Sequence, residues 1–140
     1  MKYKKQIYLA LPMDLVTEQE ILASISEYKE LLKELPVEIC STYIPNDKSE
    51  FHKRNDIEIV EDGLELLRKS DILVVDLSKD YNYFGAICEI VYAYQMKIPV
   101  IAHIAGDVFK NRPWLNYHVK YVHNTKMDII ASIRKILMIK

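Results

Sequence analysis

Short apolar runs alternate with amphipathic helical segments along this chain of 140 residues, and this alternation limits its possible folds more than any other feature. Apolar runs of strand length predict five strands, at residues 6–10, 37–43, 72–75, 98–105 and 119–122. Apolar residues at helical spacing predict helices over residues 17–35, 55–70, 85–96 and 125–137, whereas residues 107–116 are expected to be irregular around Pro113. Strands that alternate with helices favour a parallel sheet with helices on both faces. We therefore predict a doubly wound, flavodoxin-like α/β fold with strand order 2-1-3-4-5.

The helix starts carry recognisable caps, and each helix carries one apolar stripe. Thr17 and Glu20 form a T-x-x-E capping box at the first predicted helix. The stripe of the second helix consists of Ile57, Val60, Leu64 and Leu67.

Composition limits the cellular setting and the partners. Lys and Arg number 19 and Asp and Glu number 20, a balance that argues against a nucleic-acid partner. Cys40 and Cys88 lie in separate apolar segments, which suits a reducing cytoplasm better than a disulfide framework. No stretch approaches the roughly 20 apolar residues of a membrane span. We predict a single cytoplasmic domain over residues 1–140, with small molecules or further copies of the chain as partners.

In a sheet of order 2-1-3-4-5 the ligand crevice lies at the carboxyl ends of strands one and three, where the strand order reverses. Residues 8–13, 76–89 and 105–116 are therefore expected to surround one cavity. The chain has three glycines, Gly63, Gly85 and Gly106, and no G-x-G-x-x-G or Walker loop, which argues against a dinucleotide dehydrogenase or a P-loop NTPase. The four histidines stand at no persuasive ligand spacing, so we predict neither a metal nor a cofactor.

Glu89 is the main candidate for chemistry at this crevice. It follows Gly85 by four residues, in the first or second turn of a helix whose amino end faces the crevice, where the helix dipole is expected to keep a carboxylate ionised. An ionised carboxylate suits attack on the acetal-like C1′ of a sugar. Asp76 ends the third strand at the crevice and Asp71 precedes it at the opposite end, so either is a candidate to protonate a leaving base. Tyr8 is placed to hold Glu89 by a hydrogen bond.

Four segments carry a more specific pattern: IYLALPM at 7–13, SDILVVD at 70–76, GAICEIVYAY at 85–94 and KIPV at 97–100. They resemble the nucleoside 2-deoxyribosyltransferases and the related nucleotide N-glycosidases, whose corresponding motifs are I-Y-x-A-G-P, the third strand, G-T-x-x-E-[IL]-G-Y-A and G-K-P-V. The resemblance implies that Glu89 is the nucleophile, that Tyr8 positions it, and that Asp71 or Asp76 contacts the base. It extends the expected substrate site to Ala10, Leu11, Pro12, Met13, Asp80, Tyr83, Gly85 and, as the contribution of a neighbouring copy, Asn111 or Asn116.

The chain also departs from that family's pattern. Leu11 replaces a glycine, and its side chain is expected either to narrow the pocket or to change which base or phosphate the pocket accepts. Tyr83 stands in the loop where an aspartate usually contacts the sugar. Leu11 and Pro12 also replace the Gly-Ser pair that holds a 5′-phosphate in the nucleotide-hydrolysing relatives. A nucleoside is therefore favoured over a nucleotide, with one alternative source of phosphate contacts in Lys48, Lys53 and Arg54.

The resulting hypothesis is cleavage or transfer at the N-glycosidic bond of a (deoxy)ribonucleoside through a covalent glycosyl-Glu89 intermediate. Two alternatives remain open: a non-catalytic module that binds or senses a nucleoside or nucleotide, and a TIR-like NAD-cleaving domain. Self-association into a dimer or larger homo-oligomer is also expected, through the aromatic residues Tyr92 and Tyr94, Met96 and the segment 112–117.

Overall fold

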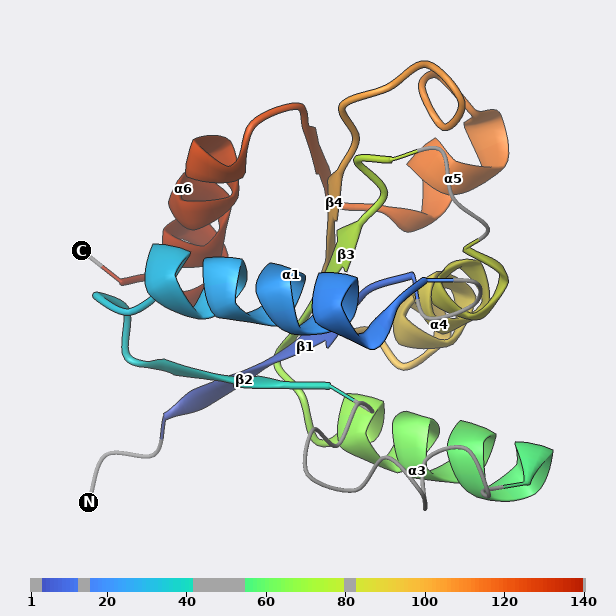
Figure 1. The fold of residues 1–140 in the computed structure, drawn as a ribbon. Helices are drawn as coiled ribbons and strands as arrows, with labels where there is room; N and C mark the ends of the chain where they lie inside the picture. The colour runs from blue at the N-terminus through green and yellow to red at the C-terminus, as the bar shows by residue number, and fades with distance from the viewer. Residues whose placement is uncertain (1–3, 13–15, 42–54, 80–82, 140) are drawn as a thin grey trace.

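The computed structural model of the chain describes residues 4–12, 16–41, 55–79 and 83–139 (Figure 1). Two of the expected substrate-site residues, Met13 and Asp80, lie outside the described residues, as do the three cationic side chains at positions 48, 53 and 54.

Five parallel strands form one sheet in the order β2-β1-β3-β4-β5, which confirms the predicted doubly wound topology. The strands are β1 Lys5–Ala10, β2 Val37–Cys40, β3 Ile72–Asp76, β4 Val100–His103 and β5 Tyr121–His123. Ala10 pairs with Val75, and Asp76 pairs with His103. The carboxyl ends of β1, β3 and β4 therefore meet at one edge of the sheet.

Helices cover both faces of this sheet, as predicted (Figure 1). One face packs against α1 Glu18–Leu31 and α6 Lys126–Leu137, and the other against α4 Phe84–Gln95, α5 Pro113–His118 and the end of α3 Asp56–Arg68. Side chains of a strand alternate between its two faces. Ile7 and Leu9 of β1 accordingly join the α1 side, whereas Tyr8 and Ala10 join the α4 side. This alternation brings Tyr8 to the face that carries Glu89.

The predicted irregular stretch 107–116 is irregular only as far as residue 112, because α5 begins at Pro113. Pro113 occupies the first turn of that helix, where its missing N–H removes no intrahelical hydrogen bond and its fixed φ suits the helix. Proline here begins a helix, so its presence was wrongly taken as a sign of irregular structure. The strands predicted at 98–105 and 119–122 are present but span Val100–His103 and Tyr121–His123.

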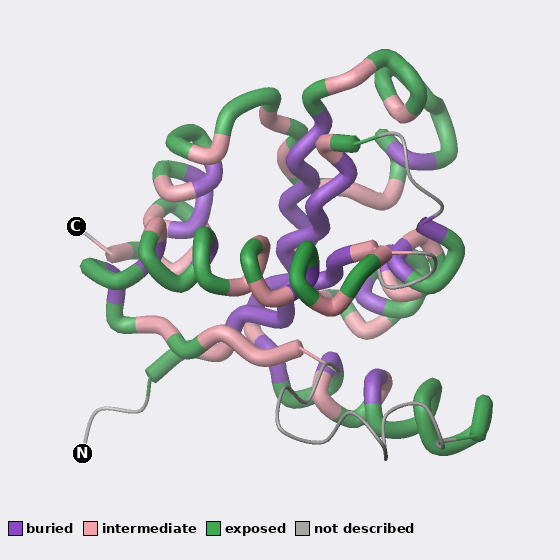
Figure 2. Tube along the Cα trace, in the orientation of Figure 1, coloured by how far each residue is buried: buried purple, intermediate pink, exposed green. Residues whose placement is uncertain are grey.

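The apolar stripe of α3 is only partly buried. Leu67 is fully buried in the core, but Ile57 and Val60 are 67% and 53% exposed. Figure 2 shows the same division: buried positions occur toward the carboxyl end of α3, and its first turns are exposed. The amino-terminal part of the helix therefore overhangs the core and leaves apolar side chains beside α4.

An aromatic surface covers parts of α4 and α5. Trp114 is 84% exposed and Tyr117 69% exposed, and the hydroxyl groups of Tyr94 and Tyr117 lie 3.1 Å apart. Exposed aromatic side chains are typical of contact surfaces. Self-association through this surface stays a prediction.

None of the helices in the described part of the chain combines the length and apolar character that crossing a bilayer requires.

Candidate active site

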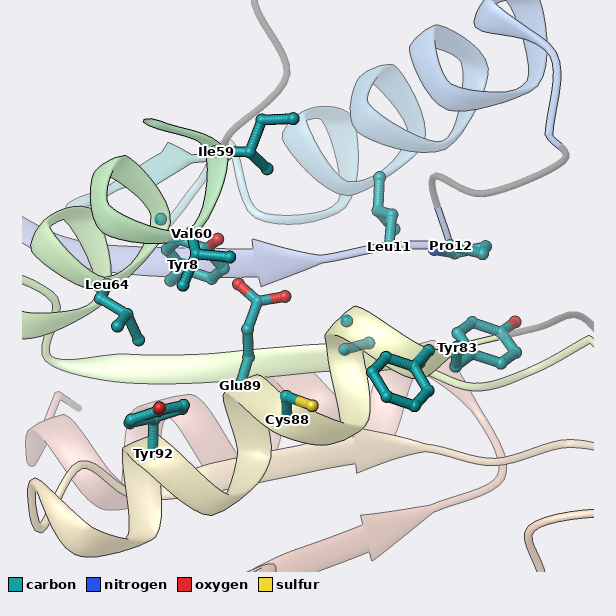
Figure 3. Close-up of a pocket in the computed structure, with 14 residues that line it drawn as sticks. Tyr8, Leu11, Pro12, Ile59, Val60, Leu64, Tyr83, Cys88, Glu89 and Tyr92 are labelled. Carbon is teal, nitrogen blue, oxygen red and sulfur yellow. The ribbon is translucent and has the colours of Figure 1, made fainter. Parts of the chain in front are cut away.

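A cavity of about 260 Å³ lies between the end of β1, the overhanging part of α3 and the beginning of α4 (Figure 3). Three chain segments supply its walls: Tyr8, Leu11 and Pro12 from β1 and the residues after it; Ile59, Val60, Gly63 and Leu64 from α3; and Tyr83, Phe84, Gly85, Ala86, Cys88, Glu89 and Tyr92 from α4 and its cap. The cavity is thus at the carboxyl edge of the sheet, where the topology predicted a crevice.

Glu89 and Tyr8 meet inside this cavity. Glu89 lies in the second turn of α4, and its carboxylate points from the helix toward the Tyr8 hydroxyl on β1 (Figure 3). The Tyr8 hydroxyl donates a hydrogen bond to that carboxylate. Tyr8 is itself buried, so the core holds the donor in place beside Glu89.

The ionisation of Glu89 differs from the sequence expectation. Burial raises the pKa of its carboxyl to about 7, and the hydrogen bond from Tyr8 offsets only part of that effect. The helix dipole was expected to keep the group ionised, but dipole effects fall off within the first turn, which holds no acidic residue here. Desolvation is the larger effect one turn further in, and Glu89 therefore titrates near neutral pH.

Asp76 lies in a smaller, adjoining cavity of about 60 Å³ rather than beside Glu89. Its carboxylate accepts hydrogen bonds from the Tyr28 hydroxyl at 2.6 Å and from the Ser78 backbone N–H at 2.9 Å, and the Ser78 hydroxyl also contacts it. His103 Nδ1 stands 3.4 Å from the oxygen that Tyr28 contacts. The Asp76 side chain thus contacts residues of α1, of β4 and of the loop that follows β3.

These contacts keep Asp76 ionised. Burial alone would raise the pKa of its carboxyl, but the hydrogen bonds from His103, Ser78 and Tyr28 outweigh burial and hold the pKa well below its usual range. A group that stays deprotonated cannot protonate a leaving base at neutral pH. The suggestion that Asp76 acts as a general acid is therefore corrected: the carboxylate ties α1, β3 and β4 together at the edge of the site.

Leu11, Pro12 and Tyr83 line both cavities and so separate them. The Leu11 side chain points toward α1 (Figure 3) and packs with Tyr28 in the core of that face, and the residue also lines the larger cavity, so its effect on the width of the pocket stays a prediction. Tyr83 is the N-cap residue of α4; its ring packs edge-on against Phe109 at 5.2 Å, and its hydroxyl accepts a hydrogen bond from the Lys79 N–H at 3.3 Å.

Other residues predicted for the site lie elsewhere. Ala10 is buried in the core beneath the cavity. Asp71 precedes β3 at the opposite end of the sheet, where its carboxylate accepts a hydrogen bond from the Gln6 N–H at 2.8 Å. Asn111 and Asn116 line a separate cavity of about 490 Å³ beyond β4 and β5. Their contribution to a neighbouring copy's pocket stays a prediction, and Asp71 is not among the residues that line the Glu89 cavity.

The α3 wall was missed by the sequence analysis. Ile59 was not singled out, and Val60 and Leu64 were assigned only to the apolar stripe of the helix, yet all three line the cavity together with Tyr92 of α4. Helical periodicity shows which residues share a face of α3. It does not show whether that face packs in the core or extends past it and lines a cavity. Within the described ranges, no cluster of three or more His, Cys, Asp or Glu side chains is placed to hold a metal ion.

Comparison with known proteins gives a match in structure alone, since no family model and no curated protein matches the sequence. The 2-deoxyribosyltransferase of Bacillus psychrosaccharolyticus superposes with a TM-score of 0.66 at 18% identity, covering 89% of each chain. The 2-deoxyribosyltransferase of Leishmania mexicana gives 0.67 at 16% identity, covering 94% of this chain and 97% of that one. This chain has the 2-deoxyribosyltransferase fold.

An N-glycosidase and a signal receiver domain also match this structure. A CMP N-glycosidase of Clostridium botulinum superposes with a TM-score of 0.60 at 14% identity, covering 94% of this chain and 99% of that one. A signal receiver domain from Vibrio parahaemolyticus also matches, with a TM-score of 0.53. The 2-deoxyribosyltransferase fold therefore supports the resemblance seen in the sequence, but the function has to be argued from the site.

Proposed function

We propose that this protein cleaves the N-glycosidic bond of a nucleoside, or transfers its sugar, with Glu89 as the nucleophile. The observation that carries this proposal is the pairing of Glu89 with Tyr8: a half-buried carboxylate, oriented by a buried hydroxyl, in a cavity at the carboxyl edge of the sheet. A carboxylate held in this way suits attack on an oxocarbenium-like sugar carbon. The structures that share the fold include enzymes named for action on such bonds.

The first step forms one bond and breaks another. An oxygen of the ionised Glu89 carboxylate attacks C1′ of the sugar, and the C1′–N bond breaks with its electron pair going to the base. The product is a glycosyl ester of Glu89. The Tyr8 hydroxyl keeps the second carboxylate oxygen in place during the attack and stabilises the ionised form.

The departing base takes its proton from water at a ring nitrogen, because Asp76 stays ionised and faces the adjoining cavity. In the second step, water or a ring nitrogen of another base attacks C1′. The ester C–O bond breaks, Glu89 leaves as the carboxylate, and the incoming group loses a proton to solvent. Water gives hydrolysis, and a second base gives transfer.

The cavity walls favour a nucleoside over a nucleotide. Among the described residues that line it there is no Lys, Arg or His side chain. Apolar side chains, among them Pro12, Phe84 and Leu64, make up much of the lining. A phosphate bound there would lose its hydration without gaining a charged partner, which is costly. Neutral 5′-hydroxyl substrates are therefore proposed.

The test is base release by the purified protein. Thymidine, 2′-deoxyadenosine, 2′-deoxycytidine and their 5′-monophosphates are incubated with it, with and without a second free base, and products are separated by chromatography. The expected result is base release or exchange from at least one nucleoside, abolished in Glu89→Ala and retained in the control Glu61→Gln. Glu61 is exposed on α3 and removal of its charge leaves the cavity unchanged.

Each alternative has its own signature in the same experiment. Thermal stabilisation by nucleosides without any product would identify a binding or sensing module. Release of nicotinamide from NAD, with nucleosides left intact, would identify an NAD-cleaving domain. Either outcome, or full activity in Glu89→Ala, would contradict the proposal.

A further inference from the structure

Gly85 is the second residue of α4 and lines the Glu89 cavity. A Cβ atom added at this position would meet no other part of the described protein within 4 Å, and the backbone does not adopt a positive φ there. Neither packing nor backbone conformation therefore requires a glycine. Glycine in a helix nevertheless costs stability relative to alanine, because it loses more conformational freedom on folding.

The position of Gly85 relative to Glu89 indicates which part of the cavity stays open because residue 85 has no side chain. Residues four apart lie on the same face of a helix, one turn or about 5.4 Å apart. Side chains on a helix also lean toward its amino end. A side chain at position 85 would therefore enter the open cavity on the same face of α4 as Glu89.

The chemistry proposed for Glu89 requires substrate in that space. C1′ has to approach a carboxylate oxygen to about 3–3.5 Å before attack, so the rest of the furanose ring lies within a few ångströms of the same helix face. The ring needs a part of α4 that it can approach closely, and Gly85 provides backbone without a side chain.

We propose that Gly85 is a specificity-determining residue: its missing side chain leaves the space that the furanose ring of the substrate occupies over the first turn of α4. This inference rests on the proposed function, because it places C1′ at Glu89. It predicts that a methyl group at position 85 competes with the sugar, and that the larger ribose suffers more than 2-deoxyribose.

The first experiment compares Gly85→Ala with wild type and with the control Gln95→Ala. Gln95 is exposed at the far end of α4 and outside the cavity, so its change to alanine raises helix propensity without touching the substrate. Gly85→Ala is expected to keep or raise Tm while kcat/KM for the best deoxynucleoside falls at least tenfold and falls further for the matching ribonucleoside. Gln95→Ala should retain wild-type kcat/KM.

Two outcomes of this experiment would overturn the inference. A Gly85→Ala variant that keeps more than half of the wild-type kcat/KM would mean that the sugar does not use the space. A fall in Tm of more than about 3 °C would mean that the space is not open, since a helix that accepts alanine should gain stability.

A second experiment separates this inference from the proposed function. Thymidine and 2′-deoxyadenosine are titrated calorimetrically into Glu89→Gln and into Glu89→Gln/Gly85→Ala, neither of which can form the ester. At least tenfold weaker binding to the double variant supports the inference even if wild type shows no turnover, in which case the proposed function alone fails. Equal affinities, or no binding to either variant, would overturn the inference, and turnover by wild type would then leave the proposed function standing.

Discussion

The variant Glu89→Gln should gain stability relative to wild type as the pH rises. Glutamine has nearly the same shape but never carries a charge, so the substitution removes the cost of keeping an ionised carboxylate in a desolvated cavity. Burial raises the pKa of Glu89 from 4.5 to about 7 in the folded protein. At 1.36 kcal/mol for each pKa unit, this difference corresponds to about 3 kcal/mol.

The sign follows from proton binding. Between pH 4.5 and pH 7 the folded state retains the proton on Glu89 while the unfolded state has already released it. The free energy of unfolding of wild type therefore decreases as pH rises through this window, whereas Glu89→Gln lacks this contribution. The stability difference between variant and wild type should thus increase by about 3 kcal/mol from pH 4.5 to pH 8 in favour of the variant.

Urea denaturation of both proteins at several pH values measures this difference directly, because contributions from other groups cancel in the comparison. The control Glu61→Gln removes the same charge from an exposed position on α3 and corrects for the change in net charge. A change of less than about 1 kcal/mol between the two pH limits, or one of opposite sign, would refute the argument that desolvation controls Glu89.

Two further predictions concern the groups around Glu89. In the proposed reaction, kcat/KM should rise with pH through about 7, because only the ionised Glu89 carboxylate attacks. Tyr8→Phe should move the midpoint of this rise to higher pH, because it removes the hydrogen bond that lowers the pKa of Glu89. A pH–rate profile with an unchanged midpoint in Tyr8→Phe would contradict this. Asp76→Asn should reduce the free energy of unfolding at pH 7 by roughly 2–4 kcal/mol, because the ionised carboxylate accepts hydrogen bonds from three elements. Since the pKa of Asp76 is lowered in the fold, this stabilisation is present above pH 3.8 and diminishes as pH falls, so urea denaturation should show a smaller difference at pH 3 than at pH 7.

The sheet was predictable because its signals are local. Each strand is a short apolar run, and α1, α3 and α6 each combine an apolar stripe with a side-chain cap, which Thr17, Asn55 and Thr125 provide. Alternation of the two element types, together with the handedness of βαβ crossovers, leaves few arrangements, and 2-1-3-4-5 is the commonest for five strands. The same alternation along β1 directs Tyr8 toward α4, so its pairing with Glu89 followed from the sequence.

Ionisation states were not predictable in the same way. The sequence placed Glu89 near a helix amino end and Asp76 at the end of a strand, and both positions suggested the wrong charge behaviour. Glu89 is desolvated by side chains from α3 and β1, whereas Asp76 is stabilised by Tyr28, Ser78 and His103. Those neighbours come from distant parts of the chain, and a pKa depends on the whole surroundings of a group.

The sequence by itself therefore determined the order of the strands and the edge of the sheet at which the cavity lies, and it singled out Glu89, the residue that we propose as the nucleophile. Only the tertiary structure decided which acid titrates near neutral pH, that Asp76 fastens three elements together, and that the overhanging end of α3 forms one wall of the cavity. Periodicity records which residues share a face of one element. Burial, hydrogen bonding and the open space over Gly85 depend on how separate elements meet, which no single segment encodes.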